Sequence, residues 1–195
     1  AGGRIYQRRG IWVSFSAKKG KSDDDPIVVV KRQIDPAWSF ETLIHHVEGD
    51  IARGRSSEPS ATDVELSLLF KLPLFLLSPL VRLVMRLDDL GLLPGTFIRN
   101  DPMFASVFIA NLGSIEMDAG FHHLYEYGNI PIFITAGKVT NEVTTSPEGD
   151  ITRVPMLTLR YTFDERVEDG LYCLQSLERF RRIVEDPVAF IPEGG

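Results

Sequence analysis

A charged loop near the C-terminus and a pair of adjacent histidines hold the residue types best suited to acid-base chemistry. The loop is DERVEDG, residues 164–170, in which the carboxylate of Glu165 could exchange a proton with a substrate. His122 and His123 are the other candidate bases, because imidazole titrates near neutral pH. Glu165 could instead be a solvated or ion-paired loop carboxylate. The two histidines could instead line a subunit contact or a channel, since aromatic and histidine clusters are common at interfaces.

Other kinds of site lack the residues that they need. Adjacent histidines point apart unless the backbone turns, and no third ligand lies near His122 and His123 in the sequence, so we expect no metal site. The string KKGKSDDD at 18–25 lacks the glycine spacing of a phosphate-binding loop and is interpreted as a solvated turn. No Gly-x-Ser-x-Gly elbow is present, and Cys173 lies one turn into a predicted amphipathic helix, where it is interpreted as a bystander.

The first half of the chain predicts two strands and a helix. Residues 11–17 alternate between apolar and polar side chains, and IVVVKRQI at 27–34 follows a polar turn, so both segments are predicted strands. Asp35 and Pro36 are typical of an N-cap and a first helical residue, which predicts a helix over 37–53.

The second half predicts a further sheet segment and a final helix. Strands are expected at 105–113 and 130–139, followed by a hairpin whose turn is 146–150 and whose second strand covers 151–163. Pro187 ends the last helix, whose apolar residues recur at helical spacing: Leu171, Leu174, Leu177, Phe180 and Val184. No internal repeat separates these elements, so we predict one α/β domain.

Composition excludes several classes of partner. The chain has 195 residues, 44% hydrophobic and 25% charged, which is typical of one globular domain. A net charge of −6 argues against general binding to nucleic acid or to anionic membranes. A single cysteine, Cys173, rules out an intrachain disulfide framework, and AGGRIYQRRG at the start lacks the apolar run of a secretory signal. We therefore expect a cytoplasmic protein.

One segment, residues 66–93, is apolar enough to suggest a membrane. Lys71 interrupts its apolar run and Pro73 and Pro79 break it, so no stretch reaches the roughly 20 residues that span a bilayer. A buried, kinked pair of helices is expected here, with a helix lying on the membrane surface as the alternative.

Two motifs in the same order resemble the dihydrolipoyl acyltransferase catalytic domains of the 2-oxoacid dehydrogenase complexes, a chloramphenicol acetyltransferase-like family. Residues 161–187 resemble the family's C-terminal strand, its Asp-His-Arg-x-x-Asp-Gly loop, its helix and its Asp-Pro end. Four loop residues match: Asp164, Arg166, Asp169 and Gly170. Residues 108–128 resemble the family's Ser-Asn-Leu-Gly strand and turn.

The resemblance also locates two departures at catalytic positions. Glu165 stands where the family has the histidine that takes a proton from the thiol of coenzyme A or dihydrolipoamide. A carboxylate is a weaker base than imidazole, and losing a well-matched base typically costs about 10² to 10⁴ in rate. Ala110 stands where a serine, before Asn111, would hydrogen-bond the oxyanion of the tetrahedral intermediate. Arg166 and Asp169 are expected to form an ion pair that supports the loop, and Gly170 to serve the backbone.

The resemblance implies an α/β two-layer sandwich with a mixed sheet, in which residues 1–195 form one acyltransferase-like domain whose N-terminal part is missing. It also implies a homotrimer with a substrate channel between subunits, and acyl-CoA or a thiol as substrate, with no tightly bound cofactor. The first hypothesis is acyl transfer, with Glu165 or a nearby histidine as base and Asn111 near the oxyanion. The second is a non-catalytic trimeric scaffold that holds a partner or acyl-CoA without turnover.

Overall fold

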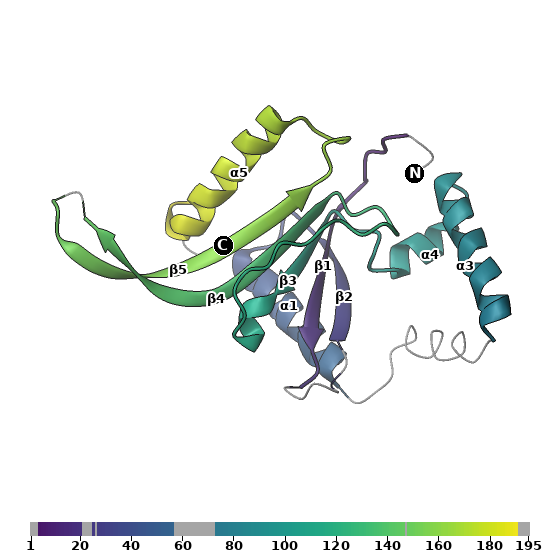
Figure 1. The fold of residues 1–195 in the computed structure, drawn as a ribbon, viewed down its shortest axis with the longest axis horizontal. Coiled ribbons are helices and arrows are strands. Elements are labelled where there is room, and N and C mark those ends of the chain that lie inside the picture. The colour runs from purple at the N-terminus through teal and green to yellow at the C-terminus, as the bar shows by residue number, and fades with distance from the viewer. Residues whose placement is uncertain (1–3, 21–24, 26, 57–72, 147, 191–195) are drawn as a thin grey trace.

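A five-stranded mixed sheet forms the centre of the computed structural model, and its strand order is β2-β1-β3-β4-β5 (Figure 1). The structure describes residues 4–20, 25, 27–56, 73–146 and 148–190. The strands are β1 (Ile11–Lys18), β2 (Ile27–Ile34), β3 (Val107–Asn111), β4 (Ile132–Thr145) and β5 (Ile151–Phe163). β1, β3 and β4 pair in parallel, whereas the outer strands β2 and β5 pair antiparallel. This mixed sheet confirms the predicted α/β class.

Helices lie around this sheet at three places (Figure 1). They are α1 (Phe40–Arg55), α3 (Leu74–Asp89), α4 (Gly95–Asn100) and α5 (Gly170–Glu185), with 3-10 turns η1 (Leu112–Ile115) and η2 (Pro187–Ala189). α1 packs on β1 and β2. α5 runs beside β5, and α3 and α4 lie beyond the other end of the sheet, near the start of the chain.

The predicted strands agree with the structure, and one helix start does not. β2 and β5 have the predicted bounds, and the hairpin turn closes where the amide of Ser146 donates to the carbonyl of Asp150 at 2.8 Å. The predicted N-cap at Asp35 is wrong. Ser39 caps α1, because its hydroxyl accepts from the amide of Thr42 at 3.1 Å, whereas the Asp35 carboxylate accepts from Ala37 and closes a preceding turn.

The apolar segment predicted as a buried, kinked helical pair falls partly outside the described residues. The described part is one continuous helix, α3, which contains Pro79. Its apolar side chains are not buried, as Phe75 and Leu83 are 75% and 52% exposed. The sequence of an amphipathic helix has the same pattern whether its apolar face packs within its own chain or against another molecule. The burial of these side chains could therefore not be predicted from the pattern. No helix among the described residues is long and apolar enough to cross a membrane.

One row of side chains crosses all five strands and faces the same side of the sheet. Strand register aligns Lys31 with Ser14, Ser14 with Phe108, Phe108 with Phe133, and Phe133 with Thr162. Side chains of directly paired residues point to the same face. Ser14, Phe108 and Phe133 are almost fully buried, so this row is the centre of the core.

The row holds the chain segments that cover this face. The hydroxyl of Ser14 donates to the carbonyl of Pro102 at 2.7 Å, and that of Thr162 donates to the carbonyl of His122 at 2.5 Å. The ring of Phe133 stacks on the ring of His122 at 3.8 Å between centroids. The polar residues of the row therefore satisfy backbone groups of an irregular cover that would otherwise be buried without partners.

Gly113 in the Asn-Leu-Gly segment and Gly137 in the Gly-Lys-Val segment lie where the backbones of two chain segments are in contact. A Cβ atom on Gly113 would lie 2.5 Å from the carbonyl oxygen of Gly137, and one on Gly137 would lie 2.5 Å from the amide nitrogen of Ala119. The pairing of β4 with β5 is irregular here, between Ala136 and Val139. These two glycines let η1 and the segment after it lie directly against β4.

α1 is tied to the sheet by a buried carboxylate. Asp50, 5% exposed, pairs with Arg32 on β2 and with Arg53 one turn further along the helix. Burial raises the pKa of Asp50, but the hydrogen bonds from the two guanidinium groups more than offset it, and the pKa lies below its ordinary value. The ionised carboxylate therefore stabilises the folded chain.

Asp50→Asn is expected to lower the free energy of unfolding by about 1–3 kcal/mol at pH 7, because Arg32 loses its charged partner while partly buried. The difference should shrink as the pH falls below about 4, where the carboxyl of the unfolded chain is already protonated. Urea unfolding at pH 7 and pH 3 measures both effects. Asp118→Asn, at an 82% exposed side chain, is the control and should change stability by less than about 0.5 kcal/mol. An equal loss in both variants would contradict the assignment.

Candidate active site

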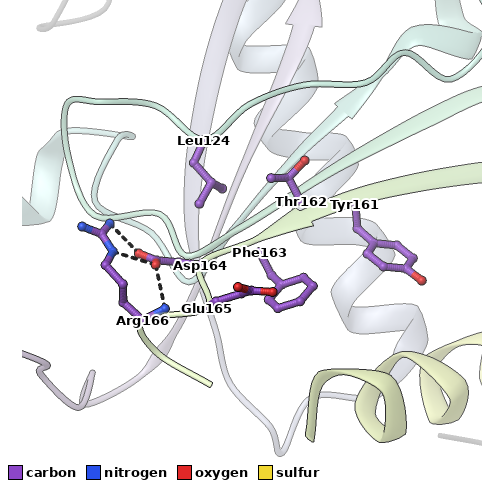
Figure 2. Close-up of a pocket in the computed structure, with 7 residues that line it drawn as sticks. All are labelled: Leu124, Tyr161, Thr162, Phe163, Asp164, Glu165 and Arg166. Atoms are coloured by element: carbon purple, nitrogen blue, oxygen red, sulfur yellow. Dashed lines mark hydrogen bonds and ion pairs between the residues drawn. The ribbon is translucent and has the colours of Figure 1, made fainter. Parts of the chain in front are cut away.

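A shallow pocket of about 470 Å³ lies where β5 runs into the charged loop. It is lined by Leu124, Tyr161, Thr162, Phe163, Asp164, Glu165 and Arg166 (Figure 2). β5 is the last strand of the sheet, so the pocket opens at the edge of the sheet.

Asp164 and Arg166 lock the first turn of the loop. The guanidinium of Arg166 donates to both oxygens of Asp164, at 2.8 and 2.7 Å, and the Arg166 amide donates to the same carboxylate at 3.0 Å (Figure 2). The hydrogen bonds from Arg166 hold the pKa of Asp164 below its ordinary value. The predicted ion pair between Arg166 and Asp169 is wrong. The guanidinium of Arg166 instead binds both oxygens of Asp164, which lies two residues before it in the chain.

Asp169 has a different role, since it caps α5. Its carboxylate accepts from the amide of Tyr172 at 2.9 Å, and Gly170 is the first residue of the helix. A negative charge at a helix N-terminus is stabilised by the free amides and by the helix dipole. Asp169 therefore fixes the angle at which the loop enters the helix.

Glu165 projects into solvent between the two locked residues. Figure 2 shows its carboxylate beside the ring of Phe163, on the side of the strand that carries Tyr161. Burial raises the pKa of Cys173 on α5, and the negative charge of Glu165 raises it further, which places Glu165 near the start of that helix. No described residue donates a hydrogen bond to the Glu165 carboxylate, so it is free to contact a substrate.

His122 lies on the opposite face of the sheet from Tyr161 and Phe163. It stacks on Phe133, which pairs with Thr162, and neighbouring residues of a strand point to opposite faces. Its Nδ1 lies 2.5 Å from the carbonyl oxygen of His123, so Nδ1 must carry the proton. In the neutral ring with this tautomer, Nε2 is the nitrogen that could accept a proton.

His123 has the same arrangement and a more exposed position. Its Nδ1 lies 2.7 Å from the carbonyl oxygen of Leu124, which lines the pocket. The structure therefore brings the His122–Leu124 segment to the edge of the pocket but places no histidine ring in contact with Glu165. Among the described residues no cluster of His, Cys, Asp or Glu could hold a metal ion.

The two residues expected to meet an oxyanion lie at the end of β3. Ala110 is 9% exposed and pairs with Thr135, under a segment held by a 2.6 Å hydrogen bond from the Thr135 hydroxyl to the carbonyl of Gly120. Asn111 is exposed, and its Oδ1 accepts from the amide of Ser114 at 3.2 Å. The Nδ2 group of Asn111 is then the donor that faces solvent.

Asn111 and Glu165 are well separated along the strand direction. Asn111 pairs with Ala136, whereas Phe163, two residues before Glu165, pairs with Ile132. Those partners are four residues apart on β4, or about 13 Å, and Glu165 lies further out still. One chain therefore cannot bring both residues to one carbonyl group.

Sequence reasoning missed two parts of this site. The ion pair between Asp164 and Arg166 could have been predicted from their opposite charges two residues apart. The same loop also contains Asp169, which was an equally plausible partner for Arg166. Leu124 gave no signal, because its place in the pocket depends on a loop that crosses β4 and β5.

The comparisons with known proteins bear on the fold. No protein-family model and no curated protein matches the sequence. Among solved structures, a probable dihydrolipoamide acetyltransferase from Listeria monocytogenes is similar over 95% of this chain and 60% of its own, with a TM-score of 0.58 and 13% identity. This chain has the fold of the dihydrolipoamide acetyltransferases.

Two further structures support this assignment of the fold. The dihydrolipoamide acetyltransferase of Azotobacter vinelandii, studied for the roles of a serine, a histidine and an asparagine in its catalytic mechanism, gives a TM-score of 0.59 at 14% identity. The cubic core of a pyruvate dehydrogenase multienzyme complex gives 0.57 at 13% identity. Each match covers 95% of this chain and 58% of the other, so the chain spans about three fifths of these acetyltransferase chains.

Asp169→Ala is expected to destabilise the protein by about 1 kcal/mol, because the amide of Tyr172 loses its acceptor. Asp169→Asn should be nearly neutral, since asparagine caps a helix as well as aspartate. Thermal or urea unfolding of the two variants measures the difference. If Asp169 acted through an ion pair instead, the asparagine variant would lose as much stability as the alanine variant.

Proposed function

We propose that this chain is a coenzyme A-dependent acyltransferase domain of the dihydrolipoyl type, whose active site is completed by a second copy of the protein. The observation that carries the proposal is the position of the charged loop. In a fold shared with dihydrolipoamide acetyltransferases, the loop from Asp164 to Gly170 joins the last strand to the last long helix, locked at one end by Arg166 and capped at the other by Asp169. This is the position of the catalytic loop in the family that the sequence resembles.

The need for a second copy follows from the distance between the two halves of the site. Glu165 and Asn111 are well separated along the strand direction of one sheet, yet acyl transfer needs a base and an oxyanion donor at the same thioester. A neighbouring copy that placed its Asn111 against Glu165 would supply both. Large exposed apolar side chains on the β4–β5 hairpin, such as Val139 and Val143, both 64% exposed, also favour assembly. A homotrimer is the assembly that we propose.

Two groups could serve as the base. Glu165 is exposed in the pocket and near Cys173 on α5. His122 lies on the other face, where its ring stacks on Phe133 and its Nδ1 is engaged by the carbonyl of His123. We favour Glu165, because the sequence resemblance aligns it with the family's histidine. The substrates are then an acyl-CoA and a thiol such as dihydrolipoamide, and a reducing compartment such as the cytoplasm fits the single cysteine.

Acyl transfer by the full-length protein, measured with acetyl-CoA and longer acyl-CoA donors and dihydrolipoamide as acceptor, tests the assignment. Glu165→Gln is expected to lower kcat/KM by about 10² or more, and Glu165→His to raise it above the native value, since imidazole is the better matched base. Glu168→Gln, in the same loop, is the control and should leave the rate unchanged. Unchanged turnover in Glu165→Gln with loss in His122→Gln would move the base to His122.

A mixing experiment tests whether the site is shared between copies. Glu165→Gln and Asn111→Ala should each be nearly inactive, because one loses the base and the other the oxyanion donor. When the two variants are unfolded together and reassembled at equal amounts, about one quarter of interfacial sites should combine an intact Glu165 with an intact Asn111. Activity should return to roughly that fraction. A mixture as inactive as its components would place the site within one chain.

A non-catalytic scaffold is the second candidate, and Ala110 favours it. Alanine has no hydroxyl to donate to an oxyanion, and here its side chain is buried. A scaffold would keep the assembly and give no turnover with any donor, including in Glu165→His. Sedimentation of the full-length protein gives the mass of the assembly in either case, and we expect three copies. A monomer at micromolar concentration would contradict both candidates.

A further inference from the structure

A second and larger pocket, of about 1010 Å³, lies at the outer edge of the sheet, around the start of β1 and the end of β2. Its walls are cationic and aromatic. Arg8, Arg9, Lys31 and Arg32 supply four positive charges, whereas Asp35 is the one carboxylate among its lining residues. Both tryptophans of the chain also line it, Trp12 and Trp38. A positive pocket in a protein of net charge −6 is a specific feature rather than a reflection of composition.

Arg32 pairs with Asp50, but two other cations of this pocket, Arg8 and Lys31, are held in place by neutral acceptors. The guanidinium of Arg8 donates to the carbonyls of Phe104 and Ala105 at 3.2 and 3.1 Å and to Oδ1 of Asn129 at 2.7 Å. The ammonium of Lys31 donates to the carbonyls of Ile98 and Asp101 at 2.7 and 2.9 Å. These neutral acceptors orient both groups, and neither group forms an ion pair with a described carboxylate.

The carboxylate that acts on Lys31 is that of Asp101, and it already accepts two other hydrogen bonds. Asp101 accepts from the hydroxyl of Tyr127 at 2.5 Å and from the amide of Met103 at 2.8 Å. Among the described residues no carboxylate forms an ion pair with Arg8, Arg9 or Lys31. Burial, together with the positive charge of Arg8, lowers the pKa of Lys31 to about 8. Burial is the larger of these two causes, and the charge of Asp101 opposes both. A bound anion would favour the charged form of Lys31.

The two tryptophans that line the pocket indicate which class of anion it would bind. The Lys31 ammonium lies 5.0 Å from the ring centroid of Trp12, and Trp38 stacks on His46 at 4.3 Å, so both indole rings are fixed. Fixed indoles beside cations suit a ligand that has a flat ring as well as negative charge, since bases stack on aromatic faces and phosphates bind Arg and Lys. The pocket volume of about 1010 Å³ is large enough for a ligand with a ring and phosphate groups.

We infer that this pocket binds a nucleoside phosphate, with the base against the indole ring of Trp12, which lies on the same face of the sheet as Lys31, and the phosphates on Arg8, Arg9 and Lys31. The ligand could be a free nucleotide or the 3′-phospho-ADP end of coenzyme A, which present the same chemistry. The site stands whether or not the charged loop transfers acyl groups, because none of its lining residues belongs to that loop.

Tryptophan fluorescence of the full-length protein reports directly on this pocket, because both tryptophans line it. Titration with ADP should change the emission and saturate, whereas inorganic phosphate should bind more than about tenfold more weakly, since it cannot stack. Dephospho-CoA and coenzyme A are the parallel arms: tighter binding of coenzyme A identifies the cofactor as the source, and tighter binding of ADP identifies a free nucleotide. No saturable change with ADP or coenzyme A at millimolar concentration would overturn the proposal.

Variants separate specific binding from general electrostatics. Arg9→Glu should weaken ADP binding severalfold, and Lys31→Gln, which keeps a donor for the two carbonyls, by about tenfold. Arg153→Glu, on the exposed end of β5, makes the same change in net charge away from the pocket and should bind as the native protein does. Equal weakening in Arg153→Glu, or none in Arg9→Glu and Lys31→Gln, would refute the site. Isothermal calorimetry gives the affinities, and circular dichroism confirms that each variant is folded.

The affinity should also depend on pH in a defined window. Arg8, before β1, and Asp101, after α4, are the charged groups that act on Lys31. Because Lys31 loses its proton near pH 8, ADP should bind more weakly at pH 9 than at pH 7 in the native protein. Lys31→Arg keeps its charge over this range and should remove most of that difference. A native affinity that does not change between pH 7 and 9 would show that Lys31 does not contact the phosphates.

Discussion

The row of side chains that crosses the sheet is the interaction on which the rest of the structure depends. Lys31, Ser14, Phe108, Phe133 and Thr162 come from five different strands, and strand register places them side by side. The two phenylalanines form the dry centre, stacked at 5.0 Å. The polar members hold irregular backbone over the sheet, so one row both packs the core and shapes the cover.

This arrangement decides where chemistry can occur. The cover closes one face, so Ala110 and the ring of Phe133 are buried, and the charged loop with Glu165 is left at the edge. The same row ends in Lys31 at the opposite edge, where Lys31 lines the cationic pocket. The two pockets are thus the two ends of one packed layer. A substitution in the row, such as at Ser14, would be expected to disturb both.

The described part of the chain exposes large apolar side chains on three elements. Phe75 on α3, Leu171 and Leu174 on α5 and Val143 on the β4–β5 hairpin are all more than half exposed. A monomer rarely leaves so many large apolar side chains in water, because each would gain about 1.5–3 kcal/mol by burial. Further protein surface against these elements would fit the proposed assembly, in which Glu165 of one copy meets Asn111 of another.

The sequence by itself determined the local structure and the candidate chemistry. Strand-forming residues bounded by turn signals located β2 and β5 to the residue, and the charged loop was identified from its residue types, because both signals depend on near neighbours in the chain. Only the tertiary structure decided the partners. Arg166 binds Asp164 rather than Asp169, the apolar stripe of α3 is exposed, and Asn111 lies far from Glu165, because each depends on strand order and on surfaces brought together from distant segments. The cationic pocket had no sequence signal, since Arg8 and Lys31 meet only when β1 pairs with β2.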